Sequence, residues 1–98
     1  MYEIRKTVQF DSWLRGIKDS AVQKRLLVRL RKASIGNLGD VRAVGAGIWE
    51  MREHFGAGWR MYFIIVGKVI VVMLGGGTKS TQSSDIKQAK KLLEDLED

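Results

Sequence analysis

Residues 48–74 read IWEMREHFGAGWRMYFIIVGKVIVVML and decide the fold, because they contain three strand-like runs separated by glycine-containing turns. The runs span residues 48–54, 59–66 and 69–74. Apolar and polar residues alternate in the first two runs, so one face of each must be the core face. Only one register places both apolar sets on that face, and it pairs Met51 with Met61 and Trp49 with Phe63. The sequence therefore predicts an antiparallel hairpin with this register.

The same register defines a polar face on this hairpin. It sets Arg52 opposite Arg60 and Glu50 opposite Tyr62. Like charges directly across a strand pair are destabilising, so folding does not require the arginine pair. An anion held between the two guanidinium groups would explain it. We therefore expect that removing Arg60 would keep or raise the stability of the fold.

A third basic residue joins this pair in the predicted sheet. A two-residue turn at 67–68 sets Arg60 opposite Gly75, which leaves open space beside the guanidinium. Lys79 follows the glycine run at 75–77 and projects to the same side if the chain stays extended. Planar guanidinium forks and a lysine point charge suit a phosphate group. Arg52, Arg60 and Lys79 are therefore candidates for a phosphate-binding site, in which Tyr62 would stack on the ligand or donate to it.

The rest of the chain places helices on both sides of these strands in the sequence. Residues 2–6 alternate as a short strand, and residues 41–44 form another. Helical periodicity predicts two helices before position 36, capped by Thr7 and by Asp19 or Ser20, and one helix after Ser83 or Ser84. The prediction is a single α+β domain, residues 1–98, with the order β-α-α-β-β-β-β-α and a mostly antiparallel sheet.

Composition limits the chemistry. Seventeen Lys and Arg residues against 11 Asp and Glu give a net charge of +6, and four of the acidic residues lie at 94–98, which makes the rest more basic still. An anionic partner is expected. The absence of cysteine and the single histidine exclude the usual zinc sites, so we expect no metal and no cofactor. No apolar run approaches the roughly 20 residues of a membrane span, and residues 1–10 lack the apolar segment of a signal peptide, so we expect a cytoplasmic protein.

Two further features are candidates for function. His54 is a candidate general acid or base, because histidine exchanges protons near neutral pH, although an exposed histidine at the end of a loop would look the same. Arg25, Arg29 and Lys32 lie at helical i, i+4, i+7 spacing. They form a candidate surface for RNA or an acidic peptide, or else a solvated helix face.

Two segments carry a resemblance to a known family. GIWEMREHFGAGWRMYF at 47–63 and VVMLGGGTKSTQSSDIKQAKKL at 71–92 resemble the RelE/ParE toxin superfamily, in the branch of addiction-module killer proteins related to HigB-type toxins. The motifs are E-x-R, G-x-G-[YW]-R and G-G-x-K-S-T-Q, in that order. Ala57 replaces the proline common in this branch, and Thr78 replaces an aspartate.

The resemblance implies a curved sheet with two N-terminal helices and a C-terminal helix packed on it. It also implies a type II toxin, an endoribonuclease that cleaves mRNA on the ribosome and is inactive when bound to a cognate antitoxin. The family's functional residues map onto Arg52, Arg60 and Lys79, and further onto Glu50 and Gln82. We expect metal-independent attack by the substrate 2′-OH, with Glu50 and His54 both candidates for the general base. The alternatives are a ParE-like toxin that poisons DNA gyrase without catalysis, or a plain nucleic-acid-binding module.

Overall fold

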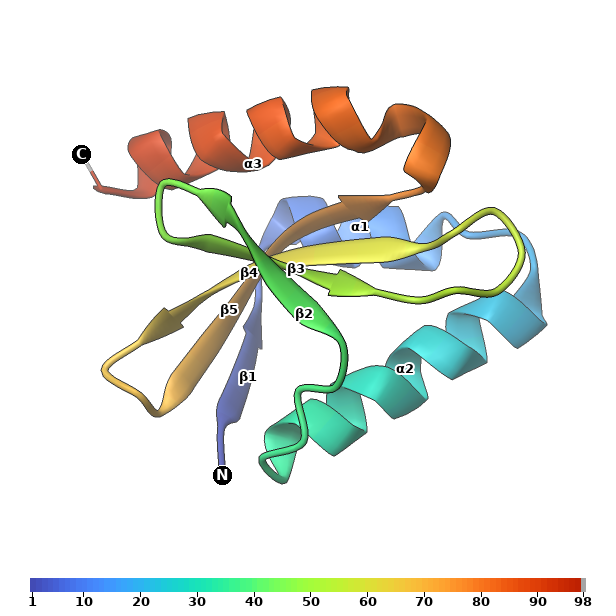
Figure 1. Cartoon of the computed structure of the whole chain (residues 1–98), viewed down its shortest axis with the longest axis horizontal. Helices are drawn as coiled ribbons and strands as arrows, with labels where there is room; N and C mark the ends of the chain where they lie inside the picture. Colours follow the sequence, from blue (N-terminus) through green and yellow to red (C-terminus); the bar gives the residue numbers. More distant parts are fainter. Residues whose placement is uncertain (98) are drawn as a thin grey trace.

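The computed structural model describes residues 1–97 and contains one five-stranded sheet and three helices. The elements are β1 (Glu3–Lys6), α1 (Val8–Arg15), α2 (Ser20–Ser34), β2 (Val41–Gly45), β3 (Ile48–Arg52), β4 (Arg60–Val66), β5 (Ile70–Gly77), a 3-10 turn η1 (Lys79–Thr81) and α3 (Gln82–Glu97). The strand order is β1-β5-β4-β3-β2, with β1 parallel to β5 and every other pair antiparallel (Figure 1). The predicted α+β class and element order are confirmed.

Helices cover both faces of this sheet. Side chains from α1 and α2 pack on one face around Phe10, Leu26 and Met61. Helix α3 covers part of the other face, where Ala89 contributes to a second buried cluster with Tyr62 (Figure 1). The face predicted to be polar and solvated is therefore half covered by α3.

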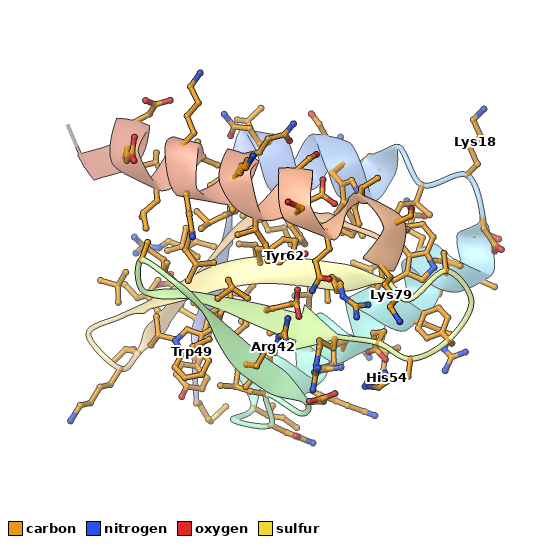
Figure 2. The ribbon with its side chains drawn as sticks, turned by 45° about the horizontal axis from the view of Figure 1, so that its top comes forward. Lys18, Arg42, Trp49, His54, Tyr62 and Lys79 are labelled. Atoms are coloured by element: carbon orange, nitrogen blue, oxygen red, sulfur yellow. The ribbon has the colours of Figure 1, made fainter. Side chains whose placement is uncertain are left out.

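The first hairpin has the predicted register, with Met51 opposite Met61 and Trp49 opposite Phe63. Met51, Met61 and Phe63 are fully buried. Trp49 is 37% exposed and is not among the residues packed on that core, so its predicted core position is wrong. It points away from α3, close to the β2–β3 turn (Figure 2).

The second hairpin differs from the prediction. Val66 pairs with Ile70, so three residues separate the strand ends instead of two. A β-bulge then shifts the register again and places Arg60 opposite Gly77, not Gly75. The extra residue of the bulge is Leu74, whose side chain is buried in the α3 cluster. Burial of this leucine under α3 is the physical reason for the shift.

Two glycines of β5 make room for neighbouring helices. A Cβ on Gly76 would collide with the ring of Trp13 in α1, and a Cβ on Gly77 would collide with the carboxylate of Asp85 in α3. The predicted open space beside Arg60 is therefore filled by Asp85.

The helix caps follow the sequence for two of the three helices. The Thr7 side chain accepts from the Phe10 amide, and Asp19 accepts from the first amides of α2. The cap predicted at Ser83 or Ser84 is wrong, because α3 begins at Gln82 as a continuation of η1. Of the acidic end at 94–98, Asp98 and the side chain of Glu97 lie outside the described residues. No helix in the described part of the chain is long and apolar enough to cross a membrane.

Candidate functional site

Arg52 and Arg60 lie directly opposite each other at the ends of β3 and β4, as predicted. Arg52 Nη2 donates to Asp40 Oδ1 at 3.0 Å, and Arg60 Nη1 donates to the Gly58 carbonyl at 2.6 Å. The protein itself therefore supplies an acceptor for each guanidinium. These acceptors pair one nitrogen of each guanidinium, while Nε of both arginines is buried without a hydrogen-bond partner among the described residues.

Lys79 joins the two arginines through the β3–β4 loop. Its amide donates to the Ala57 carbonyl at 3.3 Å. A Cβ on Gly58 would lie 3.0 Å from Arg60 Nη1 and 3.2 Å from Lys79 Cβ, so both basic residues contact this glycine. Gly58 also has a φ of +73°, which other residues rarely adopt. Figure 2 shows Lys79 at the same end of the molecule as His54. Arg60 and Lys79 therefore meet at Gly58, and Arg52 lies across from Arg60.

A buried carboxylate lies beside this cluster. Glu50 is fully buried, and its Oε2 accepts from Tyr62 Oη at 3.2 Å and from Gln82 Nε2 at 2.7 Å. Arg60 Nε lies 3.8 Å from the same oxygen, and Arg42 Nε lies 3.3 Å from Oε1. Glu50 therefore balances two guanidinium groups from inside the sheet. A carboxylate with no exposed atom cannot take a proton from a substrate in this conformation, so its prediction as the general base is wrong.

Tyr62 and Gln82 serve the same carboxylate. Tyr62 is fully buried under α3 (Figure 2), and this burial, followed by the Glu50 charge, raises the pKa of its hydroxyl well above the ordinary value. No face of the ring is free for a base, so the predicted stacking role is wrong. The amide of Gln82 is committed to Glu50, which makes it a support for the site and not a free substrate contact.

His54 extends the cluster into solvent. Its side chain is 68% exposed, and Nε2 lies 2.6 Å from Asp40 Oδ2. The hydrogen bond from His54, followed by the one from Arg52, lowers the pKa of Asp40 below its ordinary value. Asp40 thus stays ionised and fixes the imidazole, as a carboxylate partner does in many catalytic sites. The second ring nitrogen, Nδ1, has no hydrogen-bond partner among the described residues.

The predicted basic stripe on α2 is divided by burial. Arg29 is only 9% exposed; Nη1 donates to Glu53 Oε1 at 2.9 Å, and the guanidinium also binds the carbonyls of Leu38, Asp40 and Arg52. Its prediction as a substrate-binding residue is wrong, because these bonds use the whole side chain. Arg29 instead joins α2 to the segment before β2 and to the end of β3.

Arg25 and Lys32 remain on the surface of α2. The Arg25 guanidinium lies over the ring of Phe55, 3.8 Å from its centroid, so it too holds the β3–β4 loop. Lys32 is exposed and lines a shallow hollow of about 270 Å³ with Arg25 and Val28.

Sequence reasoning missed Asp40 and Arg42. Asp40 directly precedes β2 and Arg42 lies within it. The two are two positions apart, so they share a face. The β2–β3 register pairs Arg42 with Glu50. Predicting that register would have placed Asp40 and Arg42 on the face of the site. Among residues 1–97, no group of three His, Cys, Asp or Glu side chains is arranged to hold a metal ion.

Solved structures define the fold class. A chain of the intact Escherichia coli RelBE toxin–antitoxin complex superposes with a TM-score of 0.66 and 14% identity over 80% of this chain and 96% of that one. A chain of the Mycobacterium tuberculosis RelBE2 toxin–antitoxin complex gives 0.52 and 20% identity over 80% and 98%. The protein therefore has a RelE-like fold, as its motifs predicted.

Sequence comparison identifies its family. No family model matches the chain. An uncharacterized protein of Haemophilus influenzae is 42% identical over 94 residues, which cover 96% of this chain and 95% of that protein. The chain belongs to the same family as this Haemophilus protein.

Proposed function

We propose that the protein is the toxin of a type II toxin–antitoxin system and an endoribonuclease that cleaves mRNA on the ribosome. The meeting of Arg60 and Lys79 at Gly58, with Arg52 directly opposite Arg60, carries this proposal, because it concentrates positive charge where a phosphodiester could bind. The RelE-like fold supports it, since the two solved structures described above are toxin–antitoxin complexes. Such a toxin acts in the cytoplasm, where its ribosome and mRNA are.

The reaction in this proposal uses the substrate's own nucleophile. The 2′-oxygen forms a bond to the adjacent phosphorus, and the bond from phosphorus to the 5′-oxygen breaks, which leaves a 2′,3′-cyclic phosphate and a 5′-hydroxyl. Arg52 and Arg60 stabilise the charge that develops on the non-bridging oxygens. Lys79 is exposed and gives a proton to the departing 5′-oxygen.

Arg60 has a restricted part in this scheme. The residue is 7% exposed, and Nη1 is held by Gly58. Nη2 has no hydrogen-bond partner among the described residues. Unlike Nε, it is not completely buried, so it is the nitrogen left for a phosphate oxygen. The arginine is thus fixed in place before substrate arrives.

His54 is the general base in this scheme. Its Nε2 faces Asp40, so Nδ1 faces solvent and can accept the 2′-OH proton. Asp40 holds the imidazole and also Arg52, which ties the base to one of the charge-stabilising groups. Glu50 is buried and takes no proton.

A cognate antitoxin completes the proposal. Because the chain carries a net charge of +6, a partner segment rich in acidic residues fits its surface and would cover the cationic cluster or exclude the complex from the ribosome.

The test uses purified ribosomes programmed with a defined mRNA. Wild-type protein should produce a 5′-hydroxyl end, should continue to cut after metal chelation that leaves the ribosomes intact, and should not cut when the nucleotide 5′ to the cut carries 2′-deoxyribose. Lys79→Gln should lose most activity. Lys18→Gln is the matched control, because Lys18 is an exposed lysine on the α1–α2 turn (Figure 2).

Efficient cleavage of the deoxy substrate would overturn 2′-OH attack. Growth arrest by wild-type protein without any RNA cleavage would overturn the ribonuclease and leave the gyrase-directed alternative.

A further inference from the structure

Arg42 is a cation of the site face that the proposed reaction does not use. It lies on β2, the edge strand of the sheet, and pairs in register with Glu50. Its side chain is 54% exposed, and its contact within the described residues is the one between Nε and Glu50 Oε1 at 3.3 Å. Figure 2 shows Arg42 on the open side of the sheet, in front of the strands.

The contact with Glu50 engages one nitrogen of the Arg42 guanidinium. Glu50 has no exposed surface and is held on its other oxygen by Tyr62 and Gln82. With Nε at ion-pair distance from this carboxylate and 54% of the side chain exposed, the guanidinium remains accessible to a ligand. Its two Nη nitrogens form the planar fork that binds phosphate oxygens in pairs.

The sheet places Arg42 one step from the arginine pair. Asp40 directly precedes β2 and Arg42 lies two residues further along the chain, a distance of about 7 Å in extended backbone, so the two share a face. Asp40 binds Arg52, and Arg60 lies across from Arg52 on β4. Glu50, which Arg42 contacts, is the next residue of β3 on the same face. A single strand of RNA seated on Arg52 and Arg60 would therefore bring a neighbouring linkage over Arg42.

The charges of this face are unbalanced. Arg42, Arg52, Arg60 and Lys79 are four cations, and the carboxylates that contact them are Asp40 and Glu50. Asp85, which packs against Gly77 opposite Arg60, reduces this excess of positive charge but does not contact Arg42. Charged side chains also protect edge strands from aggregation, but that role does not require contact with a buried carboxylate.

We propose that Arg42 binds the phosphodiester next to the one that is cleaved, and that Glu50 is the positioning residue that aims it. This inference rests on the proposed ribonuclease function and deepens it by extending the RNA-binding surface to the edge strand β2.

The first experiment is cleavage of ribosome-bound mRNA in which single linkages near the cut are replaced by uncharged methylphosphonates. Arg42→Gln should lower kcat/KM about tenfold on unmodified mRNA, as expected for one charge-assisted hydrogen bond. On mRNA with the neutral linkage at the contacted position, wild type and Arg42→Gln should cleave equally. The matched control is Arg5→Gln, which removes an ion-paired arginine from β1 at the opposite edge of the sheet.

A conservative variant separates binding from folding. If Arg42 only balances the charge of Glu50, Arg42→Lys will restore both thermal stability and full cleavage. If it binds RNA through its fork, Arg42→Lys will restore stability but only part of kcat/KM. An equal loss on every modified mRNA, a loss no greater than that of Arg5→Gln, or full rescue by lysine would overturn the inference.

The second experiment does not depend on cleavage. Affinity for a short single-stranded oligoribonucleotide is measured against salt concentration, where each phosphate contact on a single strand contributes about 0.7 to the log–log slope. Arg42→Gln should lower the slope by about this amount, and Arg5→Gln should not. If wild type cleaves nothing, the proposed function fails and this slope still decides: equal slopes for the two variants would overturn the role of Arg42.

Discussion

The stability of an Arg60 variant shows whether this arginine serves only to bind a ligand or also stabilises the fold. The opposed arginines suggested from sequence that loss of Arg60 would keep or raise stability. In the structure Arg60 is 7% exposed, its Nε lies 3.8 Å from the buried Glu50, and its Nη1 binds the Gly58 carbonyl. Arg60→Met keeps much of the side-chain volume and removes both interactions. We therefore expect this variant to be less stable than wild type.

The size of the loss follows from the geometry. At about 4 Å and an effective dielectric constant of 20, the attraction of two unit charges is about 4 kcal/mol. Desolvation of the two groups offsets part of this attraction, and Arg42 remains on the other oxygen of Glu50 after the substitution. A net loss of about 2 kcal/mol is then expected. In a domain of this size, that corresponds to a fall in Tm of about 8–16 °C.

The assay is urea unfolding of wild type, Arg60→Met, Glu50→Gln and the double variant. Because the two groups interact directly, the losses should not add, and the double variant should recover about 1 kcal/mol or more. The same proteins are then tested for cleavage of ribosome-bound mRNA, where Arg60→Met should be inactive. Wild-type stability in Arg60→Met, or a coupling energy below about 0.5 kcal/mol, would refute the argument.

Three other substitutions test the fold around the site. Gly76→Ala should destabilise by about 1–3 kcal/mol in urea unfolding because its methyl group would meet the ring of Trp13, while Gly75→Ala has open space and should cost less. Arg29→Met should cost about 3 kcal/mol, since it removes a buried ion pair and several carbonyl contacts; a loss below 1 kcal/mol would contradict the anchoring role. The depressed pKa of Asp40 means that its bonds stabilise the protein above pH 3.8 and are lost only as pH falls further, so the stability gap between wild type and Asp40→Asn should narrow below that pH; a gap that stays constant with pH would contradict this.

The first hairpin could be predicted because parity alone decides it. A slip of one residue would have buried Arg52 beside Met61, so the sequence allows one register, and the structure has it. The second hairpin could not be predicted in this way. Residues 69–74 are apolar on both faces, so a shift of register by one residue in either direction would bury no polar side chain. The bulge at Leu74 depends on packing against α3, a tertiary contact that strand periodicity does not report.

The burial of Glu50 and Tyr62 was missed for a related reason. Alternation of polar residues marks a face as solvated only if no other element covers it. The apolar stripe of α3, which includes Ala89 and Leu93, required a sheet face of its own, and the α1–α2 core already occupied the other one. Placing α3 over β4 and β5 from that requirement would have put Tyr62 under the helix and left Glu50 in need of cationic partners.

That requirement explains why the cations of the site hold their positions without a substrate. A buried carboxylate must be paired or hydrogen-bonded, and Glu50 satisfies this with Tyr62 and Gln82 on one oxygen and Arg42 on the other. Arg42 and Arg60, the arginines that it attracts, are thereby held in place. Charge fixed in advance stabilises a developing phosphorane without reorganisation, which is the largest contribution that such a site can make to catalysis. On this argument, Glu50→Gln should lower kcat through misplaced arginines, whereas His54→Gln should lower it through loss of the general base.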